Sequence, residues 1–147
     1  MTTWSKRLSR LAATSMPERV IVDASAMVDL LTGSPVSEAV RARLRAHELH
    51  APAHFDAEVL SALGRLQRAG HLSPSQAAER IDRLATAPVD RHALPPLLAG
   101  AWGLRQNLRL VDALYVELAR QLEVTIATTD TGMAGASPFA ELLAPSP

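Results

Sequence analysis

Residues 20–26 of the chain read Val-Ile-Val-Asp-Ala-Ser-Ala. The three β-branched residues at the start show no alternation of apolar and polar side chains, which is typical of a strand buried on both faces of a parallel sheet. An apolar stretch with helical spacing follows at residues 25–31 and stops at Gly33 and Pro35. The sequence therefore predicts a short buried strand that passes quickly into a helix, with Asp23 at the junction.

The rest of the chain repeats this alternation of short apolar runs and amphipathic stretches. Helices are expected over residues 37–47, 54–69, 74–84, 95–104 and 110–122, with a last helical turn or two at 138–143. Ser73 is a favourable N-cap for the helix that begins at Pro74. Short strands are expected at 49–51, 86–89 and 124–128. Strands that alternate with helices predict an α/β fold with three α/β/α layers and a central, mainly parallel sheet.

Composition narrows the class of protein. A chain of 147 residues, 48% of them hydrophobic, suits one domain with a sizeable core. The 15 basic and 15 acidic residues balance, so no overall field draws the chain to nucleic acid or to an anionic membrane. No apolar run reaches the roughly 18 residues of a membrane helix. Cysteine is absent, which excludes disulfides and thiolate metal sites and fits a reducing, cytoplasmic location.

The first 18 residues differ in composition from the rest of the chain. Lys6, Arg7 and Arg10 lie among several serines and threonines, and no acidic residue occurs before Met16. We expect residues 1–18 to form a flexible leader and residues 19–147 to form the domain. Two alternatives exist for this stretch: it is a targeting segment, or translation starts at Met16.

Four acidic residues occupy positions that a packed α/β fold does not favour. Asp23 and Asp130 each follow a predicted strand, at the end of the sheet where functional groups collect. Glu58 and Asp112 lie within the apolar stripes of their predicted helices, where an unpaired charge costs several kcal/mol. A bound metal ion is an economical partner for all of them. Oxygen donors without sulfur favour Mg²⁺, with Mn²⁺ possible, over zinc.

Each acid also has a purely structural interpretation. Asp23 and Asp130 are candidates for turn residues or helix caps, Asp112 for an N-cap, and Glu58 for an ion pair with Arg65 or with an arginine from elsewhere in the chain. These alternatives stay open for each residue taken alone.

Other residue types offer weaker signals. His47 and His50 are one residue too close for the zinc motif H-E-x-x-H, and Pro52 opposes a helix between His50 and His54. All five histidines are therefore expected in solvent. Trp102 is expected as a core or interface anchor.

Four segments resemble, in order, the acidic motifs of PIN-domain proteins, most closely the VapC toxins of type II toxin-antitoxin systems. They are residues 20–26, 56–60, 107–119 and 128–130. The third contains Asp-Ala-Leu-Tyr-Val-Glu-Leu-Ala from Asp112 and is the most specific.

This resemblance implies a Mg²⁺-dependent endoribonuclease that acts on RNA and is neutralised by a VapB-type antitoxin. Carried over by position, Asp23, Glu58, Asp112 and Asp130 would be the catalytic, metal-binding acids. Ser25 and Thr128 match positions that support such sites through hydrogen bonds. Family members commonly form homodimers and bind the antitoxin in an apolar groove near the acids. The chain departs from the family after Asp130, where Thr131-Gly132-Met133 is small and is expected to be flexible.

Two other functions remain as alternatives. A catalytically quiet PIN-like module would bind RNA or a protein and regulate without cutting. A phosphatase acting on small phosphate esters is disfavoured because no second acid stands two residues after Asp23.

Overall fold

The computed structural model describes residues 17–147. The expected leader at residues 1–18, and the question of a start at Met16, therefore lie outside the described residues except for Pro17 and Glu18. The first elements in chain order are β1 (Arg19–Val22), α2 (Ala24–Thr32), α3 (Ser37–Leu44), β2 (Glu48–Pro52), α4 (Phe55–Arg68) and α5 (Pro74–Ala85). They are followed by β3 (Val89–His92), the 3₁₀ turn η1 (Pro95–Leu97), α6 (Leu98–Gly103), α7 (Leu110–Leu122), β4 (Thr125–Thr128), α8 (Thr131–Ala136) and β5 (Ala140–Leu142).

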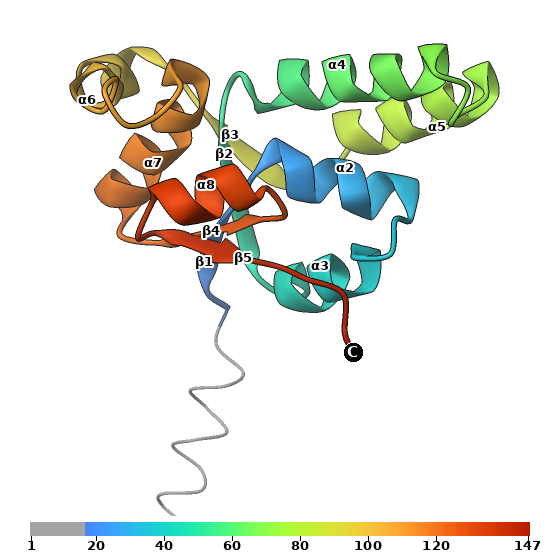
Figure 1. Ribbon diagram of the computed structural model, residues 1–147, viewed down its shortest axis with the longest axis horizontal. Helices are drawn as coiled ribbons and strands as arrows, with labels where there is room; N and C mark the ends of the chain where they lie inside the picture. Colours follow the sequence, from blue (N-terminus) through green and yellow to red (C-terminus); the bar gives the residue numbers. More distant parts are fainter. Residues whose placement is uncertain (1–16) are drawn as a thin grey trace, which may run out of the picture.

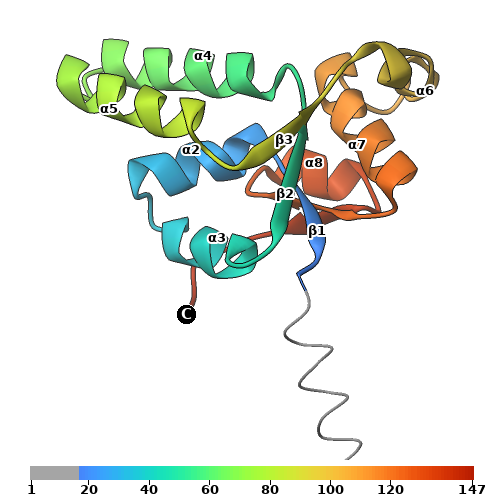
Figure 2. The ribbon, with the colours of Figure 1, turned by 180° about the vertical axis from the view of Figure 1, so that it is seen from behind.

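The strands form one five-stranded sheet in the order β3-β2-β1-β4-β5, and each neighbouring pair is parallel. The two opposite views show α2 and α3 on one side of this sheet and α6 and α7 on the other (Figures 1 and 2). The expected three-layer α/β/α fold is thereby confirmed. None of the helices within residues 17–147 combines the length and the apolar character needed to span a bilayer.

The strand order fixes where a site can form. From the central strand β1 the chain crosses to β2 on one side, and it later returns to place β4 on the other side. At such a switch point the crossovers leave a crevice beyond the carboxyl ends of the two strands. Val22 at the end of β1 pairs with Ala127 of β4, so Asp23 emerges at this crevice.

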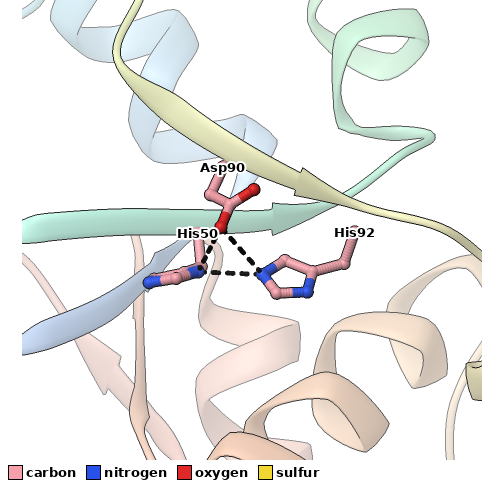
Figure 3. Close-up of side chains that lie close together, drawn as sticks. All are labelled: His50, Asp90 and His92. Atoms are coloured by element: carbon pink, nitrogen blue, oxygen red, sulfur yellow. Dashed lines mark hydrogen bonds and ion pairs between the residues drawn. The ribbon is translucent and has the colours of Figure 1, made fainter.

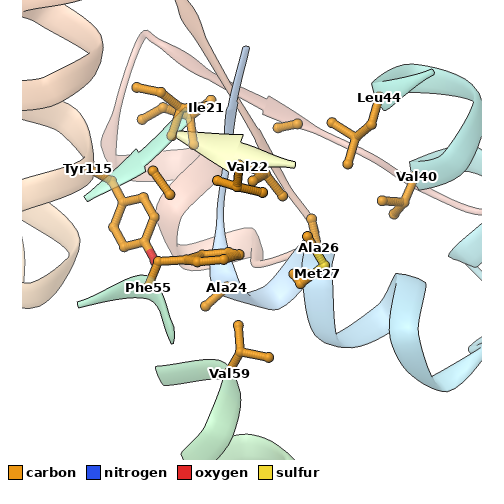
Figure 4. Close-up of a cluster of buried hydrophobic side chains, with 14 of the residues drawn as sticks. Ile21, Val22, Ala24, Ala26, Met27, Val40, Leu44, Phe55, Val59 and Tyr115 are labelled. Carbon is orange, nitrogen blue, oxygen red and sulfur yellow. The ribbon is translucent and has the colours of Figure 1, made fainter. Parts of the chain in front are cut away.

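The core surrounds β1 on both faces. Residues 20–22 have no exposed surface, as the unalternating apolar run predicts. Side chains from α2, α3, α4 and α7 gather around them (Figure 4): Met27, Val40, Leu44, Phe55, Val59 and Tyr115. The layers are held in place mainly by this apolar burial.

Two expectations for the C-terminal region are wrong. The helical turn expected at 138–143 is instead the strand β5, which pairs with the edge of β4. The segment after Asp130, expected to be flexible, forms the short helix α8, and Met133 of this helix is buried. In both places contacts with β4 override weak local preferences.

Smaller differences concern the ends of elements. The helix expected to reach residue 47 stops at Leu44, and Ala46 has a positive φ of 60°. The strand expected at 86–89 begins only at Val89. The helix at residues 110–122 has the predicted bounds, and Ser73 caps α5 with Gln76 in a reciprocal capping box.

Candidate metal centre

All four predicted acids line one pocket. Asp23 follows β1, Glu58 lies in the first turn of α4, Asp112 lies in the first turn of α7, and Asp130 precedes α8. The pocket has a volume of about 720 Å³. It lies where the switch point predicts, because Asp23 and Asp130 follow the neighbouring strands β1 and β4.

Asp23 is the most buried of these acids, with 6% of its surface exposed. Its Oδ2 accepts hydrogen bonds from Ser25 Oγ at 2.7 Å and from Thr128 Oγ1 at 2.8 Å. Burial raises the pKa of the Asp23 carboxyl, and these two hydrogen bonds oppose the shift. Asp23 occupies the N-cap position of α2, but its side chain makes no capping bond, so the cap interpretation is wrong for this residue.

Glu58 is held from α7 rather than by an arginine. The Tyr115 hydroxyl donates to Glu58 Oε1 at 2.8 Å, and His54 Nε2 lies 3.3 Å from the same oxygen. Burial raises the pKa of Glu58, and the charges of Asp23 and Asp112 add to the effect. Arg65 donates instead to Ser61, so the alternative of a Glu58–Arg65 ion pair is wrong.

Asp112 is paired with Arg109, the residue at the N-cap of α7. The guanidinium contacts both carboxylate oxygens, at 3.0 and 3.3 Å. Asp112 and, more weakly, Asp130 and Glu58 raise the pKa of Arg109. Asp112 is therefore not the N-cap of its helix, and its carboxylate remains at the pocket wall.

Asp130 is the acid for which the cap interpretation is correct. Its Oδ1 accepts a hydrogen bond from Gly132 N at 2.9 Å, and this bond fixes the start of α8. A Cβ on Gly132 would lie 3.3 Å from Asp130 Oδ1, so the glycine permits a close approach. The small residues after Asp130 therefore hold the carboxylate against a helix N-terminus instead of leaving it loose.

Three further residues of the pocket, Asp29, His54 and Arg109, are not among the site residues predicted from the sequence. Arg65, considered there as a partner of Glu58, also lines the pocket. His54 precedes Glu58 by four residues and Arg109 precedes Asp112 by three, which are helical spacings that indicate contact. Tyr115 has no such local signal, because its bond to Glu58 joins helices far apart in the sequence.

The charge in this pocket is strongly unbalanced. Five carboxylates line it, against two arginines and one histidine. The raised pKa values of Asp23 and Glu58 show that burial and mutual repulsion oppose ionisation of these acids. A cation among the carboxylates removes this penalty, and an all-oxygen donor set matches a hard divalent ion. The residues present thus fit a divalent metal.

The expectation that all histidines are solvated is wrong. His50 is buried in the sheet, and its ring lies against that of His92. His54 is largely covered by the pocket wall and by Tyr115. Trp102 is 57% exposed on α6 and stacks with Arg105, so it is not part of the core.

Comparison with known proteins finds one matching family model and closely similar sequences. The family model of the PIN domain matches residues 20–137. Ribonuclease VapC3 of Mycobacterium tuberculosis is 56% identical over 135 residues, which cover 91% of this chain and 98% of that protein.

Solved structures share the fold at low sequence identity. A toxin-antitoxin complex from Klebsiella pneumoniae has a TM-score of 0.61 and 19% identity, covering 86% of this chain and 98% of the other. VapC20 of Mycobacterium tuberculosis, a toxin that cleaves the sarcin-ricin loop, has a TM-score of 0.62 and 18% identity, covering 85% and 99%.

Proposed function

Because the chain belongs to the PIN-domain family and, within it, to the VapC ribonucleases, we propose that it is an endoribonuclease toxin that cleaves RNA with Mg²⁺, or with Mn²⁺ in its place. Residues 19–147 form the catalytic domain in this proposal. The observation that carries it is the single pocket lined by Asp23, Glu58, Asp112 and Asp130.

In this proposal the four acids hold the ion through carboxylate oxygens. When bound, a divalent cation lowers the pKa of water and neutralises charge that builds on the phosphate oxygens. Ser25 and Thr128 both donate to Oδ2 of Asp23, which orients the carboxylate and leaves Oδ1 without a side-chain hydrogen bond among residues 17–147. Tyr115 orients Glu58 in the same way from the opposite helix.

Arginines at the pocket supply attraction for the RNA backbone. Arg109 is paired with Asp112 but remains largely exposed, and Arg65 also lines the pocket. Guanidinium groups bind phosphate in a bidentate manner. Since the chain has no net charge, this local pair of cations is what directs a phosphodiester toward the acids.

The proposal is tested by RNA cleavage with purified protein. We expect cleavage in the presence of Mg²⁺ or Mn²⁺. Cleavage should stop when EDTA is added and should return when the ion is restored. Asp23→Asn should reduce the rate by about a hundredfold or more, because a charged ligand is lost. The control is Asp82→Asn, an exposed position on α5, which should keep the full rate.

Two results of this assay contradict the proposal. Undiminished cleavage by the Asp23→Asn protein removes Asp23 from the site. RNA binding without cleavage by the parent protein, in the presence of metal, supports instead the regulatory PIN-like module.

We also propose that a VapB-type antitoxin binds the groove between α4 and α5. Apolar groups of Leu60, Ala77 and Ile81 line this groove, and Ser61 lines both the groove and the acid pocket. Leu60 is half-exposed, which leaves an apolar anchor for a partner segment. One structural neighbour was solved as a toxin-antitoxin complex, which supports a partner of this class.

The groove is tested with a VapB-type antitoxin protein that inhibits RNA cleavage by this chain. Leu60→Asp should weaken inhibition of RNA cleavage by that protein at least about tenfold, since a buried apolar contact becomes a buried charge. Leu142→Asp, an equally apolar exposed position on β5, should leave inhibition unchanged. Equal inhibition of both variants would exclude the groove.

Self-association is part of the same proposal. Exposed apolar side chains of α6 and the start of α7 form one candidate dimer surface: Leu98, Trp102, Leu110 and Val111. Val111 also lines the acid pocket, so a dimer formed there would bring the two pockets near the interface.

A further inference from the structure

Three side chains of metal-binding type meet at the edge of the sheet, outside the acid pocket. They are His50 of β2 and Asp90 and His92 of β3, the edge strand (Figure 3). His50 is in register with Asp90, and His92 follows Asp90 by two residues, so the three side chains share one face of the sheet. None of them lines the acid pocket.

The donor atoms of these side chains point toward one another. His50 Nδ1 lies 2.8 Å from His92 Nε2 and 3.7 Å from Asp90 Oδ2. The distance from His92 Nε2 to Asp90 Oδ2 is 3.9 Å. Arg91 lies on the opposite face, where it binds Asp56, and so does not neutralise Asp90. Two nitrogens and one carboxylate oxygen thus converge, and the guanidinium of Arg91 does not pair with them.

His50 itself is buried, with 5% of its side chain exposed. Its second nitrogen, Nε2, lies 3.3 Å from Glu48 Oε1, which is close enough for an ion pair but outside hydrogen-bond geometry. Nδ1 and His92 Nε2 are within hydrogen-bond distance, so one of these two nitrogens carries the proton of this bond in the metal-free protein, and a bound ion would take the place of that proton. Histidines that bind metals commonly face a carboxylate with their other nitrogen.

We propose that His50, Asp90 and His92 form a second metal site, which takes a divalent ion of the Zn²⁺ type. Two imidazoles and one carboxylate match three-ligand zinc sites, in which water takes the fourth position. Imidazole donors favour such ions over Mg²⁺, so the two sites of the chain differ in chemistry.

The geometry requires only a small adjustment. Ligand distances of about 2.0–2.2 Å in a tetrahedral site place two nitrogens roughly 3.3 Å apart, so the imidazoles must separate by about half an ångström. The side chains of His92 and Asp90 are 28% and 65% exposed, which leaves them free to move and gives the ion access from solvent.

A metal at this position ties the edge strand to β2. Ala53 N already donates to the carbonyl of His92 at 2.7 Å, just before the chain enters α4. The bound ion would therefore hold the end of β3 against the strand that leads into His54 and Glu58. Its role is stabilisation of this edge, not RNA cleavage.

The test is calorimetric titration of ZnCl₂ into full-length protein stripped with EDTA. Asp90→Asn and His92→Gln should each lower Zn²⁺ affinity more than about tenfold, because each removes a ligand. His71→Gln, an exposed histidine, should retain the parent affinity. Asp23→Asn, which alters the acid pocket, should also retain it.

A second measurement does not depend on how the variants fold. In ¹⁵N-histidine-labelled parent protein, one equivalent of Zn²⁺ should shift the imidazole resonances of His50 and His92 and leave those of His71 unchanged. Unchanged resonances of His50 and His92, or parent-like affinity in Asp90→Asn, would overturn the proposal. Loss of Zn²⁺ binding in Asp23→Asn would also overturn the proposal, because this result would place the ion in the acid pocket.

Discussion

Asp23 combines deep burial with a negative charge that no arginine or lysine within residues 17–147 neutralises by a hydrogen bond or ion pair. Its two hydroxyl partners, Ser25 and Thr128, are neutral, so they orient the carboxylate more than they compensate its charge. The metal-free protein therefore carries a destabilising charge at the position where the metal-bound protein needs one.

This conflict gives a prediction for protein stability. A carboxyl whose pKa is raised by folding stabilises the fold below its unfolded pKa, and this contribution is lost as pH rises through the folded pKa. In EDTA, Asp23→Asn should match the parent protein in acid and become more stable toward neutral pH, by about 1–2 kcal/mol or a few degrees in Tm. Thermal melts of both proteins from about pH 4 to pH 7 measure this difference.

Added Mg²⁺ should make the parent protein more stable than Asp23→Asn, because only the parent protein offers the ion a charged ligand at this position. A parent protein that stays as stable as Asp23→Asn at neutral pH in EDTA would contradict the account of Asp23.

At the scale of elements, the contact between α6 and α7 depends on one glycine. A Cβ on Gly100 would overlap the carboxylate of Glu117, which is buried and held by Arg120 and Gln121. The pKa of Glu117 is lowered mainly by its hydrogen bond from Arg120, so this carboxylate does not move without losing partners. The two helices approach closely only because position 100 has no side chain.

Gly100→Ala should therefore destabilise the protein by about 1–3 kcal/mol, despite the better helix propensity of alanine. Gly103→Ala at the end of α6 is the control, since nothing lies within 4 Å of its added Cβ, and it should be neutral or slightly stabilising. Urea unfolding of the two variants gives the comparison. Equal free energies of unfolding would show that α6 does not pack on Glu117 as described.

Helices and strands of this chain differ in how far the sequence alone predicts them. Helix α7 was predictable in full because a long apolar pattern leaves little choice. Strand β5 was not, because its three residues are defined by pairing with β4 rather than by their own pattern. The four acids were predictable because charge interrupts apolar runs. Tyr115 and His50 were not, because their partners come from distant segments and ordinary residue types carry no such signal.

For the whole molecule, the exposed apolar residues of α6 and α7 lie apart from the α4–α5 groove. A large exposed aromatic side chain with apolar neighbours is typical of an interaction surface. Trp102 is the largest of these, with 57% of its surface exposed.

We predict that Trp102→Glu prevents the proposed homodimer from forming. A charge at the centre of an apolar interface would be desolvated on association, which opposes dimer formation by several kcal/mol. Sedimentation velocity at micromolar concentration distinguishes the dimer from the monomer. The control is Leu142→Glu, an exposed apolar position on the edge strand β5. A parent protein that sediments as a monomer, or an unchanged dimer in Trp102→Glu, would contradict this surface.

In the proposed function, four acids from distant segments form one metal centre. A crystal of the protein soaked in MnCl₂, with anomalous diffraction measured for manganese, tests it most directly. We predict an anomalous peak in the pocket within coordination distance, about 2–2.5 Å, of Asp23 and of at least one other of the four acids. A well-ordered pocket without a peak, or manganese bound only elsewhere, would contradict the claim.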